Sequence, residues 1–275
     1  MIGLSNPKPP ALWWSKVKRW FQLPEAEINE RDRETANCVC CGGRRSSAKE
    51  SLGLGLCMTC FNAIPWIMAV RCPVCGRPDD CPDCIRRTTC FFRYSRSAVR
   101  YDPLMKEWLA SYKYRGNERL LSLFSGMLVH AYHQLVKELP AAGHEGSGFH
   151  CISYVPMHVS RLAERGFNQA EAMAVELGRR LSLPVMPLLE RTRHTAKQSF
   201  KSRGERLNDL QGAFMLLEEA AGSIVRLQEG IAGQGWPVRV LLLDDVYTTG
   251  STLNQCAQTI TQSLPVEVYG LMWAR

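Results

Sequence analysis

The stretch VRVLLLDDVYTTGST, residues 238–252, predicts both the fold and the position of its site. Its first six residues are apolar apart from Arg239, and two adjacent carboxylates, Asp244 and Asp245, follow at once. A short apolar run bounded by polar residues is typical of a buried strand, and ligands bind at the carboxyl ends of the strands in open parallel sheets. The stretch therefore predicts a strand over 238–243 with ligand-binding side chains at its end.

The turn that follows is rich in hydroxyl groups, which is typical of a phosphate site. Its residues are Thr248, Thr249, Gly250, Ser251 and Thr252. The glycine lets the backbone approach a ligand closely, and N–H groups at the start of the next helix would join the hydroxyls in binding a phosphate dianion. Carboxylates repel phosphate, so the two aspartates are expected to accept hydrogen bonds from neutral hydroxyls or to face a magnesium ion. A ribose 5-phosphate meets both requirements. The alternative is a helix N-cap followed by an ordinary turn.

Strands alternate with helices over much of the remaining sequence, which predicts an α/β fold with a parallel sheet. Strands are expected over 151–156, 184–188, 238–243 and 266–273, and helices over 102–139, 159–181 and 251–263. The segment 191–210 is polar and basic, so we expect a loop or a mobile hairpin there.

Most of the twelve cysteines lie within residues 38–90. Eight of them form C-x-x-C pairs, which are Cys38/Cys41, Cys57/Cys60, Cys72/Cys75 and Cys81/Cys84. Two such pairs complete a tetrahedral thiolate shell, so the sequence predicts two structural zinc sites, filled in sequence order or in a cross-braced arrangement. Redox chemistry or an iron–sulfur cluster is the less favoured alternative. The thiols expected to be buried or incidental are Cys40, Cys90, Cys151 and Cys256.

The cysteine-rich stretch divides the chain into three expected parts: a lead segment (1–35), a zinc module (36–92) and a larger domain (93–275). The chain has 275 residues and a net charge of +8, which allows an anionic partner without requiring one. We find neither a secretory signal nor an apolar stretch long enough to span a bilayer, which predicts a cytoplasmic protein. The lead segment is expected to form a helix packed on the protein or a disordered tail, rather than a membrane-surface helix.

Several basic residues are candidates for contact with an anionic ligand. Arg161 and Arg165 follow the strand predicted over 151–156, and arginine matches phosphate geometry, so we expect them to bind pyrophosphate; the alternative is a solvated helix face. Lys113 is a candidate either for phosphate contact or for the surface. A further basic group is expected to contact a polyanion such as single-stranded DNA, or to form a solvated loop. Its members are Arg191, Arg193, Lys197, Arg203 and Arg206.

Taken in order, these motifs resemble the ComF family. Residues 240–252 resemble the phosphoribosyl-pyrophosphate (PRPP) motif of type I phosphoribosyltransferases. Three further stretches resemble the ComF family, namely YKYRGN (112–117), YVPMHVSRLAERGFNQA (154–170) and RTRHTAKQSFKSRGERLNDLQGAF (191–214). The cysteine-rich module does so too, and the resemblance runs from Cys38 onward.

The resemblance implies a type I phosphoribosyltransferase fold, a parallel sheet flanked by helices with a flexible hood, behind a zinc-ribbon-like module. It implies that Asp244 and Asp245 bind the ribose hydroxyls of PRPP, that residues 248–252 bind its 5-phosphate, and that the loop after Pro156 binds pyrophosphate with Mg²⁺. It also implies a role in the uptake or use of external DNA at the cytosolic side, with single-stranded DNA and other DNA-uptake proteins as expected partners. Because the sequence shows no pocket for an acceptor base, a catalytic phosphoribosyltransferase and a non-catalytic PRPP-sensing regulator both stand as alternatives.

Overall fold

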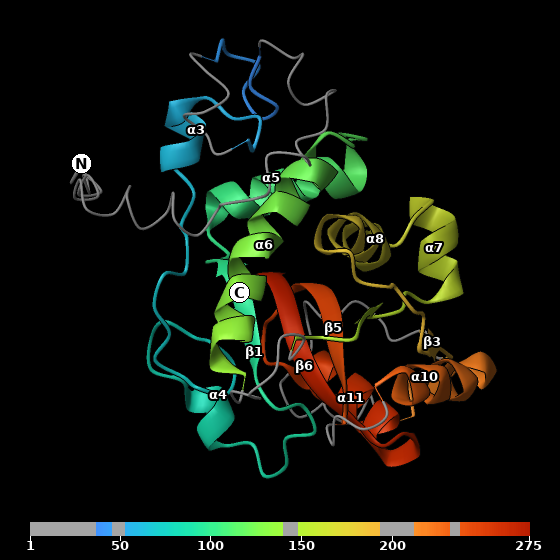
Figure 1. Ribbon diagram of the computed structural model, residues 1–275. Helices are drawn as coiled ribbons and strands as arrows, with labels where there is room; N and C mark the ends of the chain where they lie inside the picture. Colours follow the sequence, from blue (N-terminus) through green and yellow to red (C-terminus); the bar gives the residue numbers. More distant parts are fainter. Residues whose placement is uncertain (1–36, 46–52, 140–147, 193–211, 232–236) are drawn as a thin grey trace. The chain divides into compact units, whose positions relative to one another are not determined.

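The computed structural model describes residues 37–45, 53–139, 148–192, 212–231 and 237–275 (Figure 1). The chain forms two compact units, Met1–Asn62 and Ala63–Arg275. The expected boundary near residue 92 stays a prediction, and in the structure the second group of paired cysteines shares a unit with the sheet. The lead segment expected over 1–35 lies outside the described residues.

A four-stranded parallel sheet lies at the centre of the larger unit (Figure 1). Its strands run in the order β1 (Ser95–Val99), β6 (Val266–Ala274), β5 (Val238–Val246) and β2 (Cys151–Tyr154). All three neighbouring pairs are parallel. The predicted α/β fold with a parallel sheet is therefore confirmed.

Successive residues of a strand point to opposite sides of the sheet, so each face carries apolar side chains. Helices cover both faces. On one face, Val240 and Leu242 of β5 share a buried cluster with Cys256 and Ile260 of α11 (Ser251–Ser263). On the other face, Trp273 packs against Phe124 of α6 (Leu120–Glu138), with ring centroids 4.2 Å apart. Strands buried on both faces read as continuous apolar runs, which is why β5 was visible in the sequence.

Two helical stretches expected from the sequence are each divided in the structure. Residues 102–139 form α5 (Pro103–Tyr114), whose N-cap Asp102 accepts a hydrogen bond from Met105 N, and the separate helix α6. Residues 159–181 form α7 (Val159–Arg165) and α8 (Gln169–Leu181). The break lies at Gly166, which has φ 81°, a left-handed conformation that ends a helix at little cost for glycine.

The strand expected over 184–188 is wrong, because only Val185 forms a bridge there, to Ile152. The strand β3 begins later, at Leu189–Arg191, and pairs antiparallel with β4 (Phe214–Leu216). Residues 193–211 lie outside the described residues. The remaining helices are α3 (Met58–Asn62), α4 (Pro82–Ile85) and α10 (Glu218–Gly230).

Strand β1 was missed in the sequence because its residues, SRSAV, are largely polar. The Arg96 side chain is 1% exposed and still satisfied: its Nε donates to Glu138 at 2.8 Å and its Nη1 to Pro73 O at 3.0 Å. A buried charge of this kind is tolerated because it is paired and hydrogen-bonded.

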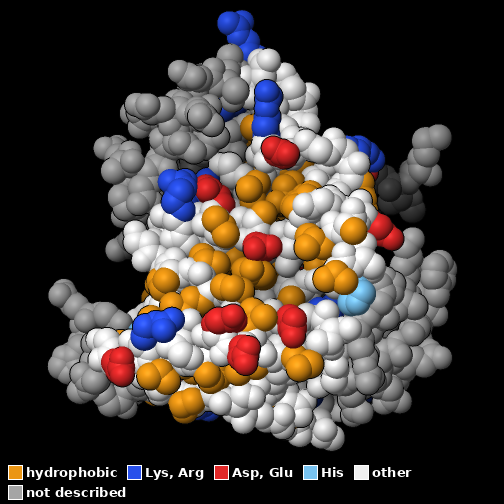
Figure 2. Space-filling model, turned by 90° about the vertical axis from the view of Figure 1, so that its right-hand side faces the viewer, with side chains coloured by type: hydrophobic (Ala, Val, Ile, Leu, Met, Phe, Trp, Pro, Cys, Tyr) orange, Lys and Arg blue, Asp and Glu red, His pale blue; other side chains and the backbone are white. Residues whose placement is uncertain are grey.

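One face of the larger unit carries scattered hydrophobic and acidic side chains (Figure 2). Exposed apolar residues of this unit include Val159, Leu162, Val175, Met215 and Val225. Among the described helices, none combines the length and the hydrophobicity that crossing a bilayer requires.

Candidate functional site

A cavity of about 350 Å³ lies at the carboxyl end of β5. It brings together eight of the residues that the sequence singled out, which are Lys113, Arg161, Arg165, Arg191, Asp244, Asp245, Thr248 and Thr252. Tyr114, Pro156, Asn168 and Gln169 also line it. Because these residues come from α5, β3, β5 and the segments around α7, α8 and α11, the cavity is a product of the tertiary fold.

The two aspartates still belong to β5, which ends at Val246 rather than at residue 243. The amide of Asp245 donates to Asp244 Oδ1 at 2.8 Å. Burial, reinforced by the charge of Asp245, raises the pKa of Asp244 to about 7. A carboxyl group of raised pKa inside a cavity is characteristic of functional sites, because a ligand or cation can relieve the cost of its charge.

Lys113 forms an ion pair with Asp245, through Nζ and Oδ2. The side chains of the two residues are 16% and 19% exposed. Lys113 lies in the last turn of α5, where the helix dipole favours a cation. Of the two interpretations of Lys113, surface residue or site residue, the structure places it in the wall of the cavity.

The arginines approach the cavity from two directions. Arg165 donates to Gln169 Oε1 at 2.7 Å and to the Tyr114 hydroxyl at 2.9 Å. Asn168 caps α8 by accepting from the amide of Ala170 at 3.0 Å. The turn between α7 and α8 is therefore fixed by hydrogen bonds, and Arg165 is held against the cavity.

Arg191 reaches the cavity from β3, where its guanidinium lies 5.4 Å from the centroid of the Phe214 ring. Burial, together with the nearby charge of Arg161, lowers the pKa of Arg191. Two arginines that repel one another are stabilised by an anion between them. The other members of the predicted basic group, Arg193, Lys197, Arg203 and Arg206, lie outside the described residues.

The turn after β5 divides its side chains between two cavities. Gly250 has φ 76° and is the N-cap of α11, as a close turn before a helix requires. Thr248 and Thr252 line the first cavity, whereas Thr249 and Ser251 line a second cavity of about 370 Å³. The hydroxyls of that second pair lie 2.8 Å apart. The structure thus brings half of the predicted hydroxyls to the aspartates.

Two contributors to the site were missed in the sequence. Tyr114 is 70% exposed at the cavity, although only Lys113 was singled out within its motif. Arg87 donates to the carbonyl of Thr249 at 2.6 Å across 162 residues of sequence. The aromatic residue next to Lys113 was a local signal that could have been used. No local pattern in the sequence predicts the contact between Arg87 and Thr249.

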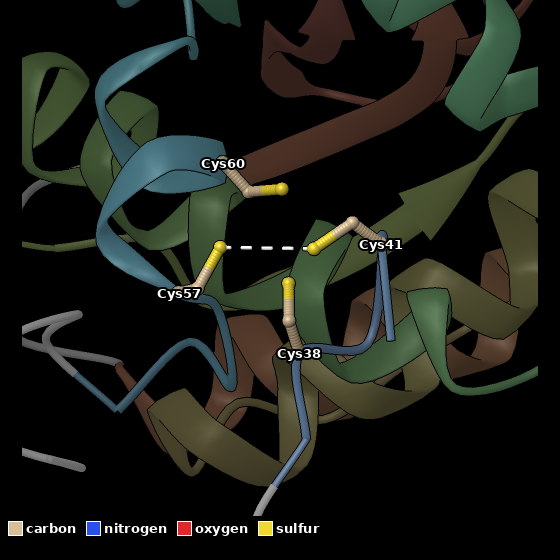
Figure 3. Close-up of side chains that lie close together, drawn as sticks. All are labelled: Cys38, Cys41, Cys57 and Cys60. Carbon is tan, nitrogen blue, oxygen red and sulfur yellow. Dashed lines mark hydrogen bonds between the residues drawn. The ribbon is translucent and has the colours of Figure 1, made fainter. Parts of the chain in front are cut away.

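The paired cysteines form two tetrads in sequence order, each with its four sulfur atoms within 4.8 Å of one another. In the first tetrad the four thiols converge on a common point, and the Sγ atoms of Cys41 and Cys57 lie 3.7 Å apart (Figure 3). Zn–S bonds of about 2.3 Å in a tetrahedron place sulfurs at about this separation. The tetrads could therefore hold structural metal ions, consistent with zinc.

The second tetrad has the same chemistry in a more buried setting. The Sγ atoms of Cys75 and Cys81 lie 3.4 Å apart. The pKa of Cys84 in this tetrad and that of Cys60 in the first are both raised. Burial is the larger cause, and hydrogen bonds to neighbouring thiols are the second. A dication would stabilise such crowded thiolates. Among the other thiols, Cys151 and Cys256 are buried, Cys40 is half-buried and Cys90 is exposed.

Comparison with known proteins gives several relatives. The chain is 28% identical over 216 residues to the competence protein ComFC of Bacillus subtilis, a match that covers 75% of this chain and 78% of that protein. It is 26% identical over 212 residues to the competence protein ComFC of Streptococcus pneumoniae, over 76% of this chain and 82% of that one. It is 27% identical over 219 residues to the DNA utilization protein YhgH of Escherichia coli, over 76% and 85%.

No family model matches the chain. The similarity to these relatives nevertheless extends over about three quarters of it, and the two cysteine tetrads and the parallel sheet agree with the resemblance found in the motifs. These findings support the resemblance of the chain to the ComF family.

Proposed function

We propose that this protein acts in the uptake or use of external DNA, and that the cavity at the end of β5 binds PRPP. The first part is supported by relatives that are named competence and DNA utilization proteins. The second part depends on one observation: two carboxylates, four basic side chains and the start of a helix meet in one cavity.

The charges in this cavity are segregated in a way that suits an activated sugar phosphate. Asp244 and Asp245 lie at the strand end, where they can accept hydrogen bonds from the ribose hydroxyls. Arg161, Arg165 and Arg191 line the same space and can bind pyrophosphate oxygens. Thr248 and Thr252 offer hydroxyls at the start of α11 for the 5-phosphate. Carboxylate oxygens are also ligands of Mg²⁺, which we expect to accompany PRPP.

The wider role follows from the same proposal. We expect the protein to work in the cytoplasm with structural zinc in both tetrads, on single-stranded DNA or with other DNA-uptake proteins. Turnover is decided by a separate measurement, pyrophosphate release with a panel of acceptor bases. Release would identify a phosphoribosyltransferase, and binding without release would identify a PRPP-binding regulator.

Titration calorimetry with PRPP and Mg²⁺ tests the ligand. The double variant Asp244→Asn, Asp245→Asn should weaken binding by at least about 100-fold, because hydrogen bonds to charged acceptors are each worth about 1.5–3 kcal/mol. A matched control exists in the adjacent carboxylates Asp79 and Asp80, whose side chains are 60% and 96% exposed. Their double Asn variant should bind as wild type does. Equal affinity in all three proteins would remove the aspartates from the site.

A further inference from the structure

The segment that follows the second cysteine tetrad contacts the turn after β5. Nη2 of Arg87 donates to the carbonyl of Thr249 at 2.6 Å and to the Tyr247 hydroxyl at 3.3 Å. Arg87 is the third residue after the tetrad member Cys84. A single guanidinium therefore joins two groups of the turn to a chain segment that begins at a metal ligand.

A second arginine links the same turn to the tetrad. Nη1 of Arg275 donates to the carbonyl of Cys75, and its guanidinium lies 4.7 Å from the centroid of the Tyr247 ring. Tyr247 is 3% exposed. A Cβ atom at Gly250 would lie 2.0 Å from the Tyr247 hydroxyl and 2.7 Å from Arg87 Nη2. The turn is thus packed directly against both side chains, with no free space between them.

The first turn of α11 is attached to the same segment. The amide of Phe91 donates to Asn254 Oδ1 at 2.9 Å, and Asn254 Nδ2 donates to the carbonyl of Thr89 at 3.1 Å. Residues 87, 89 and 91 therefore hold both sides of the turn, at 247–249 and at 254. Movement of this segment must change the position of the turn.

We propose that Arg87 is a positioning residue that couples metal binding at Cys72, Cys75, Cys81 and Cys84 to the geometry of residues 247–252. Cys84 would be fixed by a bound metal ion, and the short helix α4 would transmit that position to Arg87. Coupling between two sites is reciprocal, so a ligand that orders the turn also tightens metal binding. The proposal rests on the proposed function only for the identity of that ligand.

Hydrogen exchange on the full-length, zinc-loaded chain tests the positioning role without any ligand. The variant Arg87→Gln should speed exchange of the amides in 247–252 by about tenfold, because it removes charge-assisted hydrogen bonds. Exchange within β2 and β6 should stay the same. The matched control is Arg86→Gln, at the exposed neighbouring position, which should exchange as wild type does. Unchanged exchange of the turn in Arg87→Gln would overturn the proposal.

Zinc release to a chelating dye tests the coupling. We expect zinc to leave the two tetrads in two kinetic phases. The phase that disappears in a Cys84→Ser chain reports release from the second tetrad, and it should be about tenfold faster in Arg87→Gln than in wild type. PRPP should slow that phase in wild type and not in Arg87→Gln. If PRPP fails to bind wild type, the proposed function fails, whereas the exchange and ligand-free release results still decide the role of Arg87. A turn that exchanges faster while zinc release is unchanged would refute the coupling.

Should Arg87→Gln not fold, Arg87→Lys replaces it in both measurements. Lysine keeps the charge and lacks the planar group that reaches Tyr247 and Thr249 together. It should show smaller changes in the same direction, and wild-type exchange and release in Arg87→Lys would count against the proposal.

Discussion

At the scale of single residues, Asp244 combines a raised pKa with a position in the wall of the cavity. Its pKa is raised to about 7 by burial and by Asp245, although the cavity leaves the side chain partly accessible. In the unfolded chain, the carboxyl group of Asp244 binds a proton only below about pH 4. The charged form of this carboxyl therefore lowers the free energy of unfolding. Such a destabilising contribution is expected of a group that serves binding rather than stability.

This sign gives a pH-dependent prediction. Because the folded pKa lies above the unfolded one, the stability linked to Asp244 is present at low pH and is lost as the pH rises from about 4 to about 7. Asp244→Asn should therefore be more stable than wild type at pH 8, by on the order of 1 kcal/mol after allowing for solvent in the cavity. Urea unfolding of both proteins from pH 5.5 to 8 measures the difference, which should grow with pH.

Asp80→Asn is the control for this experiment, because the Asp80 side chain is 96% exposed. The range stops at pH 5.5 because protonation of cysteine thiolates would release zinc below it. A constant difference between Asp244→Asn and wild type across the range would contradict the raised pKa.

At the scale of elements, the strand–turn–helix unit of β5, residues 247–250 and α11 was recognised from its sequence because its signals are local. The helix expected over 251–263 has those bounds, and the strand was three residues longer than expected. By contrast, the sequence did not show which hydroxyls face the aspartates. Thr249 and Ser251 turn to the other cavity because Arg87 and Asn254 hold that side of the turn.

Gly250→Ala tests the packing of this turn. The new methyl would overlap Tyr247 and Arg87, and alanine is strained at φ 76°. We expect a loss of about 2–4 kcal/mol in the free energy of unfolding, measured with denaturant, together with loss of PRPP binding. Gly230→Ala in α10 is the control, since nothing lies within 4 Å of its Cβ position. That change should be neutral or slightly stabilising, and equal effects at the two positions would contradict the packing argument.

At the scale of the whole molecule, the two tetrads belong to different compact units. Cys72, Cys75 and Cys81 share a buried cluster with Val240 and Leu242 of the central strand. A metal ion at the second tetrad would therefore contribute to the folding of the sheet, because metal binding is coupled to the structure that brings its ligands together.

Replacing one cysteine of each tetrad distinguishes their contributions. Cys38→Ser and Cys75→Ser should each lose about one zinc ion per chain, measured by mass spectrometry. Only Cys75→Ser should also lower the unfolding temperature of the sheet, by at least about 5 °C, since about 2–4 °C corresponds to 1 kcal/mol for a unit of this size. Cys38→Ser should keep PRPP binding. The same fall in sheet stability in both variants would show that the first tetrad supports the sheet as well.

The sequence by itself determined the four C-x-x-C pairs, the buried strand that ends in two carboxylates, and the glycine turn into a helix. Each of these depends on residues a few positions apart, whose spacing reports local geometry. Only the tertiary structure decided that Lys113 pairs with Asp245 across 132 residues, that Arg87 holds Thr249 across 162, and that the polar strand β1 is buried. These contacts arise from the packing of distant elements, where position in space, and not spacing along the chain, sets which groups meet.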